Sequence, residues 1–411
     1  MFNPIKQSTK YINKVIENGF RTSKNKNFNN LLIKSFCKKV GVKYGVTISS
    51  GTAALHTALL SLELKKGDEV IMPAITMSAV AYSIILVGAK PIFADVDINT
   101  MNIDPNSVKQ KITDKTRAII CVSLYGLPPN YTKLKDIIKK NKKKIFLVED
   151  NAECLFAKHN RKFAGSFGDF SMFSFQSSKT ITCGEGGILL TNNKKLYLKA
   201  KMYSNLGYYI NNNTYQKNRL MLQGTDFKRH QLLGFNYRLS ELGAAAVLGQ
   251  LEGSEKIIQY RIKSGVKFND IVKNYNFIKS QLVESHNTHS YWAFSIVFKN
   301  TNYFNLFKNI FVQHGGDFFY GCWLPPYKEE FYKKLKFNKQ ICKNAESIQK
   351  RTVQLKTNYY NNKDLTKQLI ALKKTSHFVY TLDVQNFENS NLYCYRQMFS
   401  YSYKFFQEFQ I

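Results

Sequence analysis

The chain has 411 residues, and its 60 Lys and Arg against 28 Asp and Glu give a formal net charge of +32. This length excludes a minimal binding module, and a content of 44% hydrophobic residues excludes a wholly disordered chain. No apolar run approaches the roughly 20 residues that a membrane-spanning helix needs. Because the charge is spread over lysine-rich turns and helix faces, without an arginine-rich or aromatic-interleaved stretch, it favours a solvated basic surface over a nucleic-acid site.

The N-terminal segment, residues 1–44, is predicted to be helical and to pack on a large domain. Its first residues, MFNPIKQSTKYINK, lack the apolar core and cleavage site of a secretory signal, which predicts a cytoplasmic protein. The cysteines are odd in number and have no spacing typical of metal ligands, so we expect free thiols and no metal at Cys37, Cys121, Cys154, Cys183, Cys322, Cys342 and Cys394.

Residues 45–192 alternate short apolar runs with helical patterns. The runs predict strands over Gly45–Ser49, Glu69–Pro73, Lys90–Asp97, Arg117–Gly126, Lys144–Asp150, Gly168–Phe175 and Gly186–Asn192. Helical patterns lie between several of them, at Thr52–Lys65, Ser78–Gly88 and Thr132–Asn141. Strands separated by such helices predict an α/β fold with a mostly parallel sheet buried on both faces, within a large domain over 45–255.

The C-terminal part mixes helices and strands. Glu241 to about Tyr275 is predicted as one long helix that leaves the large domain, because it is alanine-rich at first and has no proline. A strand over Tyr291–Phe298, a Gly-Gly-Asp turn and the aromatic segment Phe318–Tyr327 follow. We therefore expect a smaller α+β domain over 256–411.

Two features at predicted strand ends suggest ligand contacts. The segment Ser49–Ala54 precedes a helix, so its backbone N–H groups and hydroxyls converge on a point suited to a phosphate, although it could also be an ordinary helix cap. Glu149 and Asp150 end a buried strand, and ligands of open α/β sheets bind beyond the carboxyl ends of strands. Asp150 is thus placed to meet a ligand cation, with a solvated strand end as the alternative.

Two further features lie later in the chain. Lys179 follows a strand, among hydroxyls and before a glycine-rich turn, where it is either a solvated lysine or a desolvated nucleophile facing a phosphate. The loop Leu233–Glu241 is polar and caps the predicted long helix, with Ser240 as a fair cap residue. Phosphate cup, strand-end carboxylate and lysine, in this order, are the parts that an enzyme using pyridoxal phosphate needs.

With these features in this order, the sequence resembles the DegT-type sugar aminotransferases, a branch of the fold type I enzymes that use pyridoxal 5'-phosphate. The resemblance runs from about Ser49 to Leu251 and continues more loosely to the C-terminus. It also includes the motifs Gly67–Pro73, Gly88–Asp97 and Gly165–Asp169.

The resemblance implies a role for each matching residue. Lys179 falls where the family's lysine bonds the cofactor aldehyde, and Asp150 falls where a carboxylate pairs with the pyridine nitrogen. Glu153 matches a position near the ring hydroxyl, and the phosphate cup matches Gly51, Thr52 and Ser174.

Two more positions carry implications from the family. Asn236 matches a residue that reaches the phosphate of the neighbouring subunit, which implies a homodimer with shared active sites, whereas Arg238 in the same loop is either structural or substrate-facing. Met77 stands where the family usually has an aromatic residue stacked on the cofactor ring; a thioether can also pack there. Asn151 replaces a small residue beside the aspartate.

The implied function is amino transfer, most simply from L-glutamate to a nucleotide-linked keto-deoxysugar, with a 4-keto sugar favoured, for cell-surface polysaccharide or O-antigen synthesis. Lys179 argues against the family's dehydratases, which have histidine there. A cyclitol or aminoshikimate-type ketone is an alternative acceptor. The segment His314–Trp323 either approaches the acceptor or is only a turn followed by core aromatic residues. A remote alternative is a non-catalytic regulator that binds nucleic acid; otherwise we expect neither nucleic-acid nor membrane partners.

Overall fold

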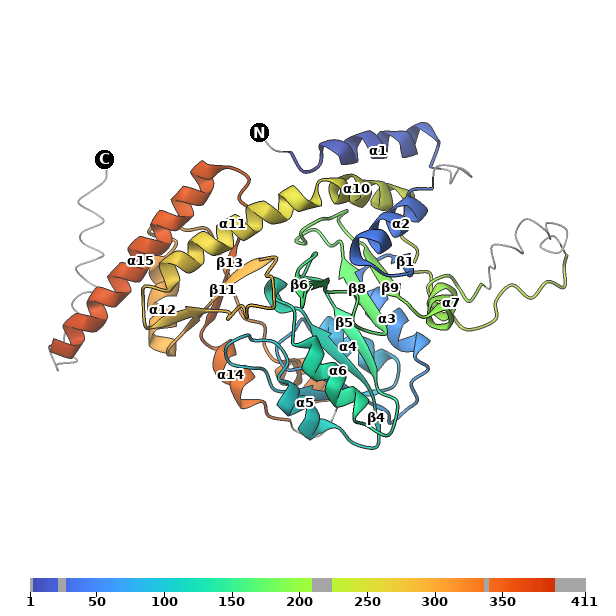
Figure 1. Cartoon of the computed structure of the whole chain (residues 1–411), viewed down its shortest axis with the longest axis horizontal. Coiled ribbons are helices and arrows are strands. Elements are labelled where there is room, and N and C mark those ends of the chain that lie inside the picture. Colours follow the sequence, from blue (N-terminus) through green and yellow to red (C-terminus); the bar gives the residue numbers. More distant parts are fainter. Residues whose placement is uncertain (1–2, 21–26, 209–223, 336–339, 389–411) are drawn as a thin grey trace.

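The computed structural model describes residues 3–20, 27–208, 224–335 and 340–388, and it is built around a seven-stranded sheet in the order β1-β9-β8-β5-β4-β2-β3 (Figure 1). Strand β9 runs antiparallel to both of its neighbours, whereas the pairs among the strands from β8 to β3 are parallel. The strands are β1 (Tyr44–Ile48), β2 (Glu69–Pro73), β3 (Lys90–Ala94), β4 (Thr116–Val122), β5 (Phe146–Asp150), β8 (Phe170–Ser174) and β9 (Gly187–Thr191). The predicted α/β class with a mostly parallel sheet is confirmed.

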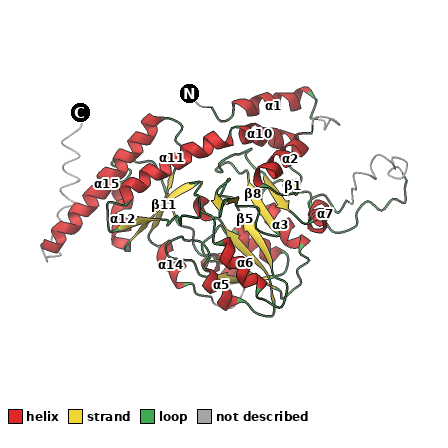
Figure 2. Cartoon of the chain, in the orientation of Figure 1, coloured by secondary structure: helices red, strands yellow, loops and turns green. Residues whose placement is uncertain are grey.

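Both faces of this sheet are buried by helices, as the uninterrupted apolar strands require (Figure 2). Along β4, Ile120 packs into the cluster of α3 and α4, whereas Ile119 and Cys121 pack into the cluster of α5 and α6 on the other face. These helices are α3 (Gly51–Ser61), α4 (Ala79–Leu86), α5 (Pro105–Lys111) and α6 (Tyr131–Lys139). The carboxyl ends of β2, β4, β5 and β8 consequently meet at one edge.

A third apolar cluster joins the N-terminal helices to the β1–β9–β8 side of the sheet. It includes Val15, Phe36 and Leu248, and Figure 1 shows α1 lying along α10. The helices of this cluster are α1 (Lys6–Glu17), α2 (Phe28–Val40) and α10 (Glu241–Glu252), whereas α7 (Lys194–Tyr203) packs with α3 in the cluster of α3 and α4. Residues 6–17 and 28–40 are helical and pack against this side of the sheet.

The predicted single helix over Glu241–Tyr275 is wrong in one respect. The structure has two helices, α10 and α11 (Ser254–Val272), separated by Gly253. Gly253 has φ −96° and ψ 5°, and its N–H bonds back to the Gln250 carbonyl, which closes the last turn of α10. Glycine adopts this interruption readily because it is a poor helix former.

The C-terminal part has its own four-stranded antiparallel sheet in the order β10-β11-β13-β12. Its strands are β10 (Ile278–Ser280), β11 (Ala293–Phe298), β12 (Tyr320–Gly321) and β13 (Thr352–Lys356). Its helices are α12 (Thr301–Ile310), α13 (Glu330–Lys334), α14 (Lys343–Gln349) and α15 (Asn362–Glu388), which lies beside α11 in Figure 1. The domain limits at 44/45 and 255/256 stay a prediction.

Two expectations about the whole chain can be compared with the described residues. No helix within 3–20, 27–208, 224–335 or 340–388 has the length and apolar character to cross a bilayer. The cysteines within these ranges are free thiols, as predicted, and Cys394 lies outside them.

Candidate functional site

A cavity of about 520 Å³ lies at the carboxyl edge of the large sheet. Its lining brings together seven of the eight site residues predicted from the sequence: Gly51, Thr52, Met77, Asp150, Glu153, Ser174 and Lys179. The strands position them, because Asp150 ends β5, Ser174 ends β8 and Gly51 opens α3 directly after β1. The cavity is therefore the candidate functional site.

The first turn of α3 forms the predicted anion cup. Ser50 caps the helix, its Oγ accepting from the Ala53 N–H at 3.1 Å, while the first N–H groups of a helix have no partner within it. Glycine at position 51 avoids crowding, because a Cβ there would lie 3.0 Å from the Ser174 Cβ and 3.2 Å from its Oγ. Backbone N–H groups and the Thr52 and Ser174 hydroxyls thus converge on the cavity, which suits a phosphate group.

The two adjacent carboxylates at the end of β5 have different surroundings because successive strand residues point to opposite faces. Glu149 is buried away from the cavity and accepts the N–H groups of Gly165, Phe167 and Gly168 at 2.6, 2.7 and 2.6 Å. Asp150 lines the cavity and, among the residues that the structure describes, accepts only the Ala152 N–H, at 3.0 Å. Burial raises the pKa of Asp150 to about 6, against the opposing effects of that bond and of Lys179.

Lys179 lies in the cavity between an acid and an aromatic ring. Its Nζ is 3.6 Å from Glu153 Oε1 and 4.5 Å from the centroid of Trp292. The other carboxylate oxygen of Glu153 accepts the Tyr125 N–H at 2.9 Å. Burial raises the pKa of Glu153 to about 7, although Lys179 lowers it. Lys179 is thus part of a buried cluster with Glu153 and Asp150. It is not an ordinary solvated lysine.

Met77 lines the cavity but is 57% exposed. Its thioether is therefore available to a ligand.

Asn151, which has no interpretation from the sequence, has a structural one. Its Oδ1 accepts the Ser123 hydroxyl at 2.7 Å and the Tyr131 hydroxyl at 3.3 Å inside the sheet's buried edge. Asn151 thus fixes the loop after β4 and does not line the cavity.

Asn236 is the one predicted site residue that does not line this cavity. It is exposed and forms an isolated bridge with Asn205. The neighbouring Arg238 donates from Nη1 to Asn205 Oδ1 at 2.9 Å, which gives it a structural contact. Within a single chain, Asn236 therefore has no place in the site.

A wall of the cavity comes from the C-terminal part of the chain and includes residues that the sequence does not identify. Trp292 and Gln354 line the cavity, and no local motif marks either of them. From the segment His314–Trp323, only Tyr320, Gly321 and Trp323 line it. A periodic pattern cannot reveal this wall, because it is formed by strands that pair far apart in sequence.

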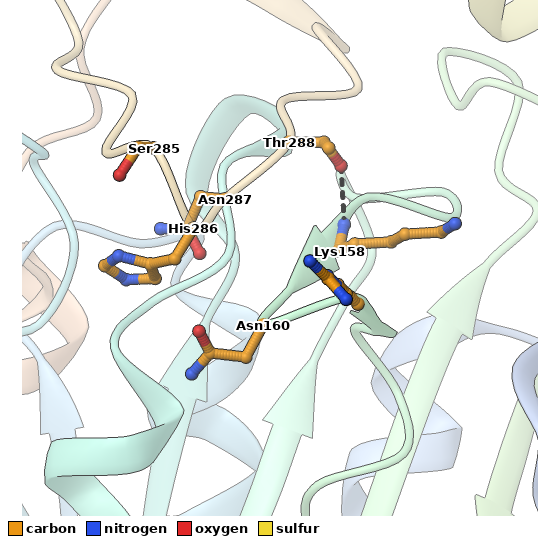
Figure 3. Close-up of a pocket in the computed structure, with 7 residues that line it drawn as sticks. Lys158, Asn160, Ser285, His286, Asn287 and Thr288 are labelled. Atoms are coloured by element: carbon orange, nitrogen blue, oxygen red, sulfur yellow. Dashed lines mark hydrogen bonds between the residues drawn. The ribbon is translucent and has the colours of Figure 1, made fainter.

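A second cavity, of about 530 Å³, lies beside the hairpin of β6 (Lys158–His159) and β7 (Lys162–Phe163) (Figure 3). It is lined by Lys158, Asn160, Arg161, Ser285, His286, Asn287 and Thr288, and it shares no lining residue with the site cavity. The Thr288 hydroxyl accepts the Lys158 N–H at 2.7 Å across it. No predicted site residue lies here.

Comparison with known proteins gives a family match over most of the chain. The model of the DegT/DnrJ/EryC1/StrS aminotransferase family matches residues 4–371. The GDP-perosamine synthase of Escherichia coli O157:H7 is 36% identical over 289 residues, which is 70% of this chain and 74% of that protein. A putative L-glutamine:3-amino-2,3-dideoxy-scyllo-inosose aminotransferase of Streptoalloteichus tenebrarius is 35% identical over 234 residues, which is 57% of this chain and 53% of that one.

The solved structures agree in fold. A putative sugar aminotransferase from Streptococcus pneumoniae in its PLP form superposes with a TM-score of 0.80 at 21% identity, covering 91% of this chain and 97% of that one. The family and this PLP form together imply pyridoxal phosphate as cofactor.

Proposed function

Because the chain belongs to the DegT/DnrJ/EryC1/StrS aminotransferase family, we propose that it transfers an amino group from L-glutamate to a nucleotide-linked keto-deoxysugar. A 4-keto sugar carrying GDP is the first choice, since the synthase from E. coli that it resembles is named for a GDP-linked sugar. The observation that carries the proposal is the convergence of the α3 cup, Asp150 and Lys179 on one cavity. Membership in an aminotransferase family also favours an enzyme over a nucleic-acid-binding regulator.

The residues present fit pyridoxal phosphate. Because Gly51 has no Cβ to crowd Ser174, the N-terminus of α3 stays open to a phosphate. Asp150 lines the same cavity and would supply the anion for the pyridine nitrogen. Glu153 and the exposed Met77 would face the ring hydroxyl and the ring itself. When bound, this cofactor supplies an aldehyde for an amine and a ring that accepts electrons from the substrate carbon.

Lys179 is the group that we propose for covalent attachment and for proton transfer. Its ammonium is held by the Glu153 carboxylate and by the π-face of Trp292, so Nζ is fixed at one place in the cavity. Glu153, with a pKa of about 7, is suited to exchange a proton with the amine near neutral pH. Once displaced by substrate, the amine would remain in place to move a proton from the donor carbon.

Asp150 would act through its charge. Its burial makes ionisation costly in the protein alone, and this cost is offset when a cationic ring nitrogen lies beside it. Asp150 would in return keep that nitrogen protonated.

Replacement of the lysine tests the proposal. We expect Lys179→Ala to lose both the visible absorbance of bound cofactor and all transamination above background. Lys195→Ala removes an exposed lysine on α7 and should change neither. Turnover of a keto sugar with glutamate by Lys179→Ala at the wild-type rate would show that the assignment is wrong.

The acceptor can be identified in a separate experiment. Protein loaded with pyridoxamine phosphate is mixed with GDP-, UDP- and dTDP-linked 4-keto and 3-keto sugars, and loss of the amine form is followed spectroscopically. Fastest conversion with the GDP-linked 4-keto sugar supports the first choice.

A cyclitol ketone is the second candidate acceptor, favoured by the similarity to the scyllo-inosose aminotransferase, whose name also gives L-glutamine as donor. Free GDP should compete with a nucleotide sugar but not with a cyclitol. Rates with glutamine and glutamate distinguish the donors.

The remaining parts of the proposal concern context. We propose a cytoplasmic homodimer in which Asn236 completes the neighbour's site, serving cell-surface polysaccharide or O-antigen synthesis. The exposed position of Asn236, outside its own cavity, is consistent with such sharing. The basic exterior would help to draw in an anionic nucleotide sugar.

A further inference from the structure

One face of the C-terminal sheet closes the site cavity. Phe294, Ile296 and Val353 belong to the apolar cluster that includes residues of α11, α12 and α15. Ala293 and Val297, which alternate with them along β11, belong instead to the cluster of the large sheet. Because side chains alternate along a strand, Ser295 is also on the face toward the large sheet.

The register of the sheet places three polar or amphipathic side chains in one row on that face. Gln354 of β13 pairs with Ser295 of β11 on one side and with Tyr320 of β12 on the other. Residues directly opposite in antiparallel strands share a face, so the three lie side by side. The row reaches the cavity at Gln354 and Tyr320.

The Gln354 amide has a fixed orientation. Its Nε2 donates to the Gly321 carbonyl at 2.6 Å, and because a carbonyl can only accept, the amide nitrogen must be on that side. Oε1 is therefore left as an acceptor on a side chain that is only 5% exposed and lines the cavity. Within the described part of the chain, this oxygen has no hydrogen-bond donor, and the buried Ser295 hydroxyl beside it has no partner either.

Two parallel aromatic faces complete this wall. The rings of Trp292 and Trp323 are 6.3 Å apart at 19°. Trp292 is held at both ends, because its Nε1 donates to the Ser178 carbonyl at 2.9 Å and its own carbonyl accepts from Arg261 at 2.8 Å. Flat apolar surfaces with one convergent acceptor are what a ring bearing hydroxyl groups requires.

We propose that Gln354 determines acceptor specificity, its Oε1 accepting a hydrogen bond from a ring hydroxyl of the keto sugar that packs against Trp292 and Trp323. This inference rests on the proposed function and deepens it, because it concerns the acceptor alone. The amino donor carries no ring hydroxyl for this oxygen. A buried acceptor left unpaired by a deoxy substrate is costly, so the site should select against such substrates.

The test compares the GDP-linked 4-keto-6-deoxysugar with its two analogues that lack one further hydroxyl, at C2 or at C3. Wild-type holoenzyme should convert one of these analogues with kcat/KM lowered by about 10- to 100-fold. Gln354→Met keeps the length of the side chain and removes the acceptor. In this variant, kcat/KM for the parent sugar should fall to within about twofold of the variant's own kcat/KM for the same analogue. Gln313→Met removes an exposed glutamine outside the cavity and serves as control.

The half-reaction with glutamate separates this inference from the proposed function. Conversion of bound cofactor to its amine form by glutamate in Gln354→Met shows that the variant is folded and holds cofactor. If that half-reaction is intact and Gln354→Met keeps the wild-type discrimination against both analogues, the inference is overturned while the proposed function stands. If wild-type enzyme reacts with glutamate but converts none of the three sugars, the acceptor class is wrong and the inference fails with it.

Discussion

The carboxyl group of Glu153 should make the stability of the cofactor-free protein depend on pH. Burial raises its pKa from 4.5 to about 7, so the folded state holds a proton that the unfolded state has released between these values. The contribution of Glu153 to the free energy of unfolding should therefore be largest below pH 4.5 and fall as pH rises toward 7. At about 1.4 kcal/mol for each pH unit and bound proton, the loss amounts to roughly 3 kcal/mol.

Glu153→Gln should remove this loss. Glutamine cannot ionise, so the free energy of unfolding of the variant, relative to wild type, should rise by roughly 3 kcal/mol between pH 4.5 and pH 7. Loss of the ion pair with Lys179 displaces the curve of the variant without reproducing this slope. Asp150, whose pKa is also raised, remains in both proteins.

Urea unfolding of the cofactor-free proteins at pH 5, 6, 7 and 8, followed by far-UV circular dichroism, measures both curves. Glu17→Gln, at the exposed end of α1, controls for the loss of a carboxylate elsewhere. Parallel curves for wild type and Glu153→Gln over this range would refute the reasoning.

Two further predictions concern the cup and the proposed dimer. Gly51→Ala puts a Cβ 3.0 Å from that of Ser174, so the affinity of the variant for pyridoxal phosphate, titrated spectroscopically, should fall by tenfold or more. The control Gly253→Ala, whose new Cβ would be 3.8 Å from its nearest neighbour, should retain wild-type affinity. Unchanged affinity in Gly51→Ala would contradict the assignment of the first turn of α3 as the phosphate site. If Asn236 acts in the neighbour's site, Asn236→Ala should bind cofactor weakly and Lys179→Ala should be inactive. Mixing the two variants should restore activity, because one site of each hybrid dimer holds both residues. No gain of activity on mixing, or sedimentation as a 47.5 kDa monomer, would argue against shared sites.

The sequence predicts the large sheet well because its strands are buried on both faces. A short apolar run such as Glu69–Pro73 fits a buried strand better than other secondary structures. The predicted limits of this strand are those of β2 in the structure. The prediction of one helix over Glu241–Tyr275 is wrong at Gly253 because a single glycine is a weak local signal. The clusters do not mark the break either, since α10 and the first turns of α11 pack in the same one.

The part of the cavity proposed to hold the cofactor was predictable for a related reason. Gly51, Asp150 and Lys179 each follow or precede a strand at the same sheet edge, so local position in the chain fixes position in space. Trp292 and Gln354 were not predictable, since their places depend on the register of β11, β13 and β12. Likewise, the adjacent Glu149 and Asp150 look equivalent until the direction of each side chain is known.

The two tryptophans of the chain, Trp292 and Trp323, both line the site cavity. All indole emission of the protein therefore originates at the site. Energy transfer from these rings to a bound chromophore would quench that emission without any background from elsewhere in the fold. The intrinsic tryptophan fluorescence of the unlabelled protein should therefore report occupancy of the site.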